Sequence, residues 1–338
     1  MSEELKHDDF MYGGQAVIEG VMMRGPRYFA IACRRANKTI IVAQEPISSI
    51  LTKLRWLNKP FLRGALSLID ALVLGIRALT FSANIAMEDV QAEEAAKKAE
   101  ESGADQPAKS ADGDEKPERV NDLVVTGTMV LGIVLGLGLF IVLPNLLAAL
   151  AHRWTESRIW LNLIEGCIRI AIFVGYVASV SLLKDIRRVF EYHGAEHKII
   201  NTYEDHQELT QEEAAKRTTV HVRCGTSFIL VVMVVSIVVF SFLPWRSGLE
   251  RVLSRLVLLP LVAGISYEVI RFAGRHRELA LLRAALAPGL WMQKITTRQP
   301  SPDQVEVAKT ALESVFDAEN RHNAGEKVEP SLTTIPGC

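Results

Sequence analysis

Residues 123–143 read LVVTGTMVLGIVLGLGLFIVL, 21 positions without a single charged side chain. A transmembrane helix needs about 20 predominantly apolar residues, so this stretch predicts a membrane span. The whole chain agrees, because 49% of its 338 residues are hydrophobic and its mean hydropathy is +0.17. Its net charge of -1 argues against a nucleic-acid surface, which needs a clear excess of Lys and Arg.

Three further apolar stretches predict spans, at residues 160–183, 225–243 and 252–270. The second span contains Glu165 and Arg169, which lie four apart and can pair on one helix face. The fourth contains Arg255 near one end, Pro260 in the middle and Glu268 near the other end. Ionisable side chains at membrane depth are functional candidates, unless they lie close enough to the span ends to reach the interface.

Residues 60–87 are apolar except for a polar residue at every seventh position: Arg63, Asp70, Arg77 and Asn84. On a helix these four form one narrow polar stripe, which favours an interfacial or re-entrant helix over a lipid-exposed span. Residues 88–121 differ in kind, since Ala, Glu, Lys, Asp and Gly dominate and aromatics are absent. That composition predicts a disordered, charged linker.

The distribution of Lys and Arg predicts the orientation. They are concentrated in the loop 184–224 and in the segment that follows residue 270, whereas the loops after the first and third spans carry two each. By the positive-inside rule, the loop and both termini are cytoplasmic in a bacterial inner membrane. The first 20 residues hold four acidic side chains and no apolar core, so no cleavable signal peptide is expected.

Residues 11–59 predict a β-rich cytoplasmic segment. Strand-like runs at 16–18, 28–33 and 39–42 are separated by turn sequences at 24–27 and 36–38, and a short amphipathic helix is expected at 47–58. Residues 271–319 predict cytoplasmic helices, the last starting at a capping box from Ser301 to Gln304, and residues 320–338 a flexible tail. The expected fold is a mainly α membrane protein with about four transmembrane helices and a small β-containing cytoplasmic domain.

The stretch 192–198 in the cytoplasmic loop reads YHGAEHK. On a helix His193 and His197 lie one turn apart on one face, with Glu196 beside them. The order H-x-x-E-H is that of the inverzincin metallopeptidases, in which two His bind Zn²⁺ and the Glu activates water. The alternative is a surface helix with scattered His. Gly194 lowers the stability of a helix at this position by about 1 kcal/mol relative to Ala, which argues against a regular helix.

Further donors follow along the chain. Glu204 continues the same helical face, and His221 and Cys224 form a second pair of donors three residues apart. A divalent transition metal, with Zn²⁺ favoured, fits two arrangements. Either His193 and His197 take a third ligand from the other donors and leave a position for water, with Glu196 as general base, or a closed structural site forms from His193, His197, His221 and Cys224.

Six other polar side chains are candidates for a site: Gln15, Glu19, Arg24, Arg223, Glu268 and Arg271. The first three lie in the first strand and turn, where a solvent-facing strand edge is the simpler explanation. Arg223 and Arg271 are candidates for stabilising a developing oxyanion. The four cysteines share no framework spacing, so Cys33 and Cys224 are expected in a reducing compartment.

Several stretches carry a family resemblance: residues 13–26 (GGQAVIEGVMMRGP), 192–198, 221–226 (HVRCGT), 266–268 (SYE) and 288–297, which starts PGLW and ends TT. On these the chain resembles the YqhQ-like family of bacterial multi-spanning membrane proteins, described as predicted metal-dependent enzymes. The resemblance implies a membrane protein with a cytoplasmic metal site. It supports His193, His197, His221 and Cys224 as ligands and Glu196 as a base, and it implies no particular reaction.

Two functions from different classes remain open. The first is a metal-dependent hydrolase that acts on a substrate at the cytoplasmic face of the bilayer. The second is a non-enzymatic membrane scaffold or transport and assembly factor, with a structural metal or none. The expected partners are the lipid bilayer and a substrate or protein that the sequence does not identify, and the sequence leaves homo-oligomerisation open.

Overall fold

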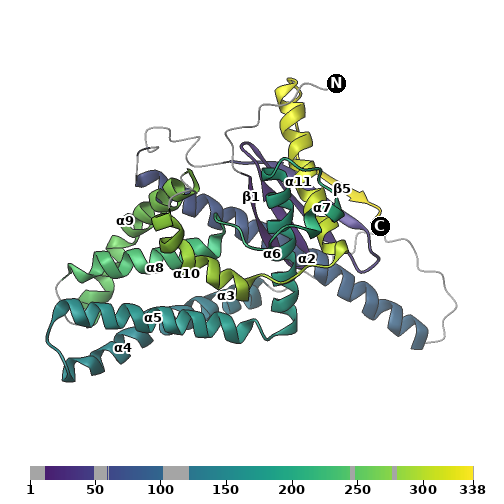
Figure 1. Ribbon diagram of the computed structural model, residues 1–338. Helices are drawn as coiled ribbons and strands as arrows, with labels where there is room; N and C mark the ends of the chain where they lie inside the picture. The colour runs from purple at the N-terminus through teal and green to yellow at the C-terminus, as the bar shows by residue number, and fades with distance from the viewer. Residues whose placement is uncertain are drawn as a thin grey trace.

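The computed structural model describes residues 12–48, 59, 61–101, 122–243, 248–275 and 280–337. A small sheet and the helices packed on it form one part, and a bundle of apolar helices forms the other (Figure 1). The expected amphipathic helix at 47–58 lies almost wholly outside the described residues. The same is true of residues 102–121 of the expected linker.

The sheet has five antiparallel strands in the order β1-β2-β3-β4-β5. Their bounds are β1 Gly13–Val17, β2 Gly20–Arg24, β3 Tyr28–Arg34, β4 Ile40–Pro46 and β5 Ser331–Ile335. The small sheet at the amino end and its turns at 24–27 and 36–38 are therefore confirmed. The expected strand at 16–18 extends into the turn after β1, and β2 is not among the expected strands, because the two-residue turn between them ends at Glu19, which has a positive φ of 51° and no typical turn chemistry.

The expectation of a flexible tail at 320–338 is wrong for residues 320–323 and 331–335. Helix α11, Pro302–Asn323, continues past residue 320, and β5 pairs with β4 from Ser331 opposite Gln44 to Ile335 opposite Ile40. All five side chains of β5 are exposed, so the strand has no buried face and leaves no hydrophobic pattern in the sequence. Backbone hydrogen bonds to the edge of the sheet hold it in place.

Helices cover both faces of the sheet. Val21 and Met23 of β2 point to the face on which α6, Lys184–Glu204, and α11 pack, and Met22 points to the opposite face. There Leu74 and Ala78 of α2 complete a second apolar core. The expected capping box at Ser301 and Gln304 is present at the start of α11. The sheet thus fixes α6, which carries the histidines, against a rigid support.

Helix α2, Leu62–Glu101, is longer than expected. Two members of its predicted polar stripe pair with other elements, Arg77 with Glu45 of β4 and Arg63 with Glu268, although Arg77 and Asn84 are themselves exposed. The disordered linker expected from residue 88 is wrong as far as Glu101, because Ala, Glu and Lys are strong helix formers and one Glu–Lys pair there is four residues apart. The face of α2 opposite the sheet is apolar and exposed, for example at Leu72 and Val73.

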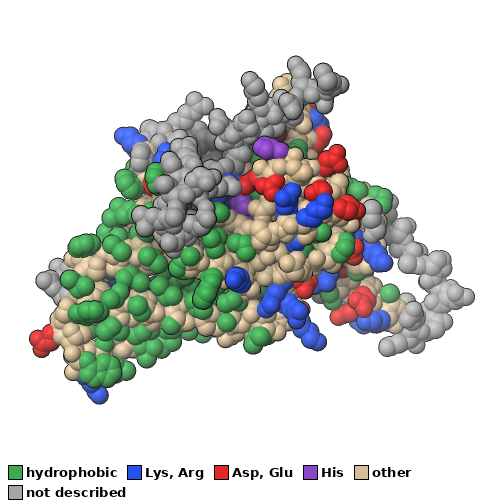
Figure 2. Space-filling view, viewed as in Figure 1, with side chains coloured by type: hydrophobic (Ala, Val, Ile, Leu, Met, Phe, Trp, Pro, Cys, Tyr) green, Lys and Arg blue, Asp and Glu red, His purple; other side chains and the backbone are tan. Residues whose placement is uncertain are grey.

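The other part is a bundle of apolar helices, and hydrophobic side chains dominate its surface on the left of Figure 2. Its elements are α3 Asp122–Leu137, the π-helical η2 Gly138–Val142, α4 Leu143–Leu150, the 3₁₀ turn η3 Ala151–Arg153, α5 Arg158–Val180, α8 Gly225–Ser241, α9 Gly248–Arg275 and α10 Ala280–Thr296. Charged side chains gather over the sheet part on the right.

In the part of the chain that the structure describes, four helices are long and apolar enough to cross a membrane: Leu62–Lys98, Val130–Leu150, Ile159–Val180 and Val252–Ala273. The number agrees with the sequence, but the set differs. Helix α8 falls short at 17 residues, and α2 qualifies although its middle packs on the sheet. Helix α8 nevertheless packs among α5, α9 and α10 in the bundle. The fold is that of a multi-pass membrane protein with a compact α/β part.

Candidate metal centre

Three side chains from two elements converge where the two parts of the molecule meet. His193 and His197 project from one face of α6, and Cys224 is the N-cap residue of α8. One potential ligand atom from each lies within 4.8 Å of the other two. The Nε2 atom of His193 lies 3.2 Å from the Cys224 sulfur, and the two imidazole rings are 4.4 Å apart. The predicted helix over 192–198 and its histidine face are thus present.

Backbone carbonyls fix the tautomer of both histidines. The Nδ1 atom of His193 lies 2.8 Å from the Thr296 carbonyl, and that of His197 lies 2.5 Å from the Thr219 carbonyl. A carbonyl only accepts, so each Nδ1 carries the hydrogen and each neutral ring keeps its Nε2 lone pair. Metal-binding histidines are usually oriented in this way by a second hydrogen bond. Both rings are therefore prepared to bind an ion through Nε2.

Gly194 makes this arrangement possible. A Cβ atom at this position would lie 1.9 Å from the Arg298 carbonyl oxygen, far inside van der Waals contact. The close approach is held by a hydrogen bond of 2.9 Å from the Arg298 N–H to the Phe190 carbonyl. It brings the chain after α10 alongside α6, where the Thr296 carbonyl reaches His193. Gly194 therefore lowers the intrinsic stability of the helix, but the close packing of Arg298 against α6 requires a glycine at this position.

Buried polar side chains hold the loop that leads to Cys224. Lys198 of α6 donates to the carbonyls of Ala215 at 2.9 Å and Arg217 at 2.7 Å, at the end of α7, Gln211–Ala215. Gln293 of α10, which is fully buried, accepts from the His221 N–H and donates to the His221 carbonyl, both at 2.8 Å. The loop backbone is therefore fixed from two sides.

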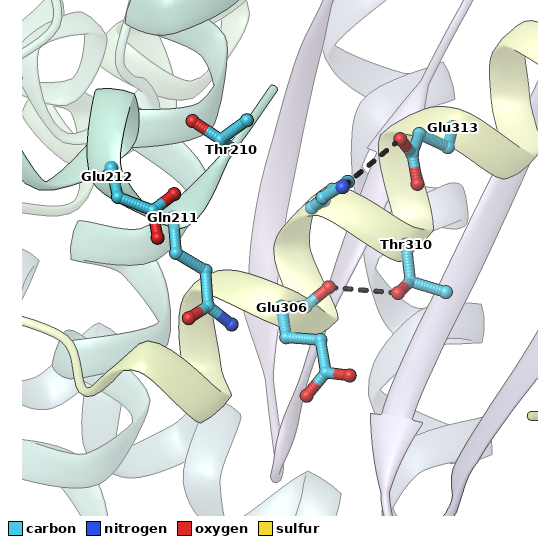
Figure 3. A pocket seen from close by; sticks show the side chains of 7 residues that line it. Thr210, Gln211, Glu212, Glu306, Thr310 and Glu313 are labelled. Atoms are coloured by element: carbon cyan, nitrogen blue, oxygen red, sulfur yellow. Dashed lines mark hydrogen bonds and ion pairs between the residues drawn. The ribbon is translucent and has the colours of Figure 1, made fainter. Parts of the chain in front are cut away.

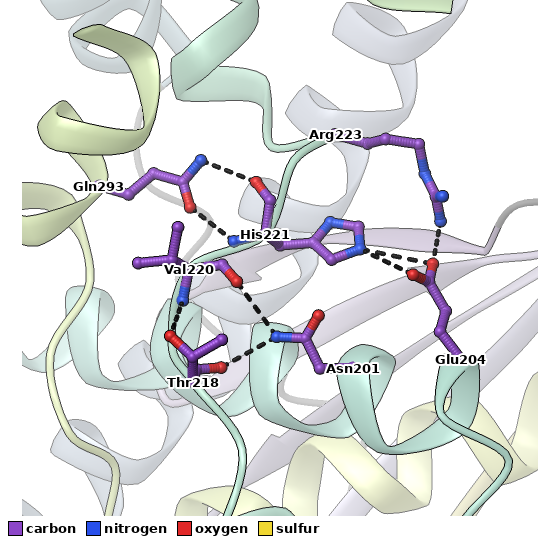
Figure 4. Close-up of polar contacts among 7 residues, drawn as sticks. All are labelled: Asn201, Glu204, Thr218, Val220, His221, Arg223 and Gln293. Carbon is purple, nitrogen blue, oxygen red and sulfur yellow. Dashed lines mark hydrogen bonds and ion pairs between the residues drawn. The ribbon is translucent and has the colours of Figure 1, made fainter. Parts of the chain in front are cut away.

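His221 and Glu204 lie beside the three converging side chains and do not join them. Figure 4 shows the His221 ring directed to the Glu204 carboxylate, with Nε2 3.3 Å from its nearer oxygen, while Arg223 pairs with the same carboxylate. Burial lowers the pKa of His221, and the hydrogen bond to Glu204 opposes that shift. A four-ligand site that includes His221 would require this ion-paired group to rearrange.

Glu196 is buried between α6 and the sheet. One carboxylate oxygen accepts a hydrogen bond from the Gly14 backbone N–H of β1, and the other, Oε2, has no hydrogen-bond partner within the described parts of the chain. Burial raises the pKa of Glu196 to about 7, against the opposing effects of His193 and of that N–H. Glu196 lies outside the group of converging ligand atoms, which is the placement expected of a base that does not bind the metal.

The other predicted site residues lie elsewhere. Gln15 packs against Gly75 of α2, and Glu19 pairs with Arg188 at the turn between β1 and β2. Arg24 ends β2. Glu268 pairs with Arg63 across α9 and α2, and Arg271 lies on α9 near Glu268. Apart from Glu268 and Arg271, which share α9, these residues lie on different elements.

One pocket lies well apart from the histidines, between α7 and α11 (Figure 3). Its volume is about 390 Å³, and polar side chains line it, three of them acidic: Thr210, Gln211, Glu212, Glu306, Lys309, Thr310 and Glu313. None of the predicted site residues lines it. The residues that sequence reasoning missed are instead those around the histidines, above all Gln293 and the carbonyls of Thr219 and Thr296. Gln293 and Thr296 lie within the family motif 288–297, and Thr219 lies outside the quoted motifs.

The sequence of this chain matches a known protein family and a known protein. The family model described as "Protein of unknown function (DUF1385)" matches residues 59–318. The chain is also 34% identical over 325 residues to the "Uncharacterized protein YqhQ" of Bacillus subtilis (strain 168), covering 96% of this chain and 97% of that protein. No solved structure matches. Neither match describes an activity, so the metal-dependent activity implied by the resemblance is still a proposal. This chain belongs to the DUF1385 family and is a relative of the Bacillus subtilis YqhQ protein.

Proposed function

We propose that this protein is a membrane-embedded hydrolase that depends on a metal ion held by His193, His197 and Cys224. The observation that carries the proposal is the orientation of the two imidazoles, each with Nδ1 on a backbone carbonyl, together with the grouping of one potential ligand atom from each ring and the Cys224 sulfur within 4.8 Å of one another. Two imidazoles and a thiolate favour Zn²⁺ among the common divalent ions. Three protein ligands are also the number found in catalytic zinc sites.

The electrostatic surroundings of the thiol support the same assignment. Cys224 lies at the amino end of α8, where the helix dipole favours a negatively charged ligand atom. The Thr226 hydroxyl lies 3.1 Å from the sulfur and supplies a further hydrogen bond. When bound, such an ion supplies a Lewis acid and makes water more acidic. Within the described residues no fourth protein donor lies in the group, which leaves a position for substrate or water.

Glu196 is the residue we assign as general base. It is on the same helix as both histidines and close enough to His193 to interact with it electrostatically, and its Oε2 atom has no hydrogen-bond partner among the described residues. A buried carboxylate with a free oxygen can accept a proton from a nucleophilic water. Because Cys224 starts an apolar helix of the bundle, the reaction would take place at the cytoplasmic boundary of the membrane.

The test uses Glu196→Gln, with Glu191→Gln as the matched control on the same helix. Glu191 accepts from Gln304 at 3.0 Å and has no part in the ligand group. Purified zinc-loaded proteins would be assayed on ester, amide and phosphoester substrates presented in micelles. We expect Glu196→Gln to keep its zinc and lose turnover by about 10²-fold or more, with the control unchanged. Hydrolysis that survives in Glu196→Gln would contradict the assigned base.

The second candidate is a structural ion. The three donors come from α6, which packs on the sheet, and from α8, which belongs to the bundle, so one ion would join the two parts of the molecule. This alternative predicts bound zinc, a lower unfolding temperature after chelation and no hydrolysis on any substrate class. Activity in the zinc-loaded protein that chelation removes and Glu196→Gln abolishes would exclude it.

A further inference from the structure

A second polar cluster lies inside the helical bundle, on α4, α5 and α9. Glu165 and Arg255 are almost completely buried, with side chains 1% and 8% exposed. Arg255 pairs with Glu165 Oε1 and donates to the Asn162 side chain at 3.1 Å. Arg169, one turn along α5 from Glu165, donates to the same Oε1 atom at 2.7 Å. Both arginines therefore share one carboxylate oxygen.

The charges in this cluster do not balance. Two guanidinium groups face a single carboxylate, and among the described residues both arginines form ion pairs with Glu165 alone. The remaining neighbours are neutral: Arg255 reaches Asn145 at 3.4 Å and lies over the Phe240 ring at 5.3 Å. An aromatic face or an amide does not neutralise a cation. One positive charge is left inside an apolar bundle, where an uncompensated charge is costly.

The hydrogen bonds of this cluster are also incomplete. The atoms that lack a partner indicate which chemical groups a ligand would need. Among the described residues, the Nε atoms of Arg169 and Arg255 are buried donors without a hydrogen-bond partner, and Glu165 Oε2 is a buried acceptor without one. A group that completes all three must carry negative oxygen atoms for the two guanidinium groups and an O–H donor for the carboxylate. Guanidinium groups bind phosphate oxygens particularly well.

We propose that Arg169, Arg255 and Glu165 form a binding site for a phosphate anion that also carries a hydroxyl group. Two sources have this chemistry, the headgroup of a polyol phospholipid and free dihydrogen phosphate. The apolar stretch of α5 begins at Ile159, and Glu165 lies about 9 Å further along the helix. A lipid headgroup drawn into the bundle can reach that depth. The site is distinct from the histidine cluster, so it is independent of the proposed hydrolysis.

The experiment measures lipid retention by native mass spectrometry of the full chain, purified in neutral detergent and incubated with equal amounts of phosphatidylglycerol and phosphatidylcholine. A parallel titration follows the unfolding temperature with inorganic phosphate. Arg255→Gln removes a cation from the cluster, Glu165→Gln removes the internal counter-charge, and Arg153→Gln changes an exposed arginine near the end of α4 as the matched control.

We expect the wild type to prefer phosphatidylglycerol and Arg255→Gln to lose about tenfold or more of that preference, as for the loss of a charge-assisted hydrogen bond. Arg153→Gln should behave as wild type, and Glu165→Gln should bind the anion at least as tightly as wild type. Stabilisation by inorganic phosphate that competes with the lipid would assign the free anion as the source.

Three results would overturn the proposal. The first is equal retention of both lipids together with no effect of phosphate. The second is an equal loss of preference in Arg153→Gln and Arg255→Gln, which indicates attraction to surface charge. The third is a loss of the preference for phosphatidylglycerol in Glu165→Gln. The measurement on Glu165→Gln tests the proposal even where Arg255→Gln does not fold.

Discussion

The two buried polar clusters of this molecule differ in how their hydrogen bonds are completed. Around His193 and His197, each ring gives its N–H to a backbone carbonyl, and the remaining donor atoms converge with the Cys224 sulfur. Around Glu165, two arginines share one oxygen, and three buried atoms have no partner. We therefore propose a cation as the ligand of the first cluster and an anion as the ligand of the second.

The largest effect is expected at the anion cluster. Glu165→Gln leaves two arginines without a counter-charge, and removing one partner of a buried ion pair costs about 3–5 kcal/mol of folding free energy. The unfolding temperature in detergent should fall strongly and recover in part when phosphatidylglycerol is added. Glu93→Gln, in an exposed pair with Lys97 on α2, is the control and should leave the unfolding temperature unchanged.

Gly194→Ala should have the next largest effect, because it acts on the metal cluster through the backbone. The added Cβ would meet the Arg298 carbonyl at 1.9 Å, and the expected cost of about 3 kcal/mol is at the upper end for overpacking. The shift should also move Thr296 away from His193, so bound zinc should fall. Gly175→Ala on α5 has open space around it and is the control. Normal zinc in Gly194→Ala would contradict the role of this contact.

Gln293→Ala tests the outer shell of the same cluster. It removes three buried hydrogen bonds, two to the His221 backbone and one of 2.7 Å to the Ser227 hydroxyl. Loss of such a supporting group typically weakens metal affinity by about 10–100-fold. Competition with a chromophoric zinc chelator measures the change. The exposed Gln207→Ala is the control, and equal affinities in the two variants would show that the loop needs no such support.

The smallest effect concerns two buried thiols in different surroundings. Burial raises the pKa of Cys33 to about 12, with a smaller contribution from Glu19, so at pH 8 roughly one molecule in ten thousand carries the thiolate. Cys33 should resist iodoacetamide in the native protein with or without zinc. Cys224 should be protected only while zinc is bound. Mass spectrometry of labelled peptides distinguishes them, and modification of Cys33 in the folded protein would contradict its burial.

The sequence predicts local features of both regions well. Uncharged apolar stretches predict the bundle, and the one-turn spacing of His193 and His197 predicts their shared face on a helix. It fails where a contact is made between distant segments. Strand β5 has no buried side chains to reveal it, and the Thr219 and Thr296 carbonyls carry no side-chain signal at all.

His221 and Glu204 show the same limit within the predicted site. Their residue types fit zinc, and their positions on the helical face and in the loop allow it. In the fold, Arg223 pairs with Glu204 and holds its carboxylate against His221, away from the converging donors. Ligand identity therefore depends on how one neighbouring ion pair is satisfied, which spacing along the chain does not specify.

The measurement that tests the central claim most directly is zinc content by elemental analysis of the detergent-purified protein. Wild type should hold close to one zinc per chain, and His193→Ala, His197→Ala and Cys224→Ala should each lose it. His221→Ala and the exposed His206→Asn should retain it. Absence of metal from wild type even after reconstitution, or loss in His221→Ala equal to that in His197→Ala, would contradict a three-ligand site.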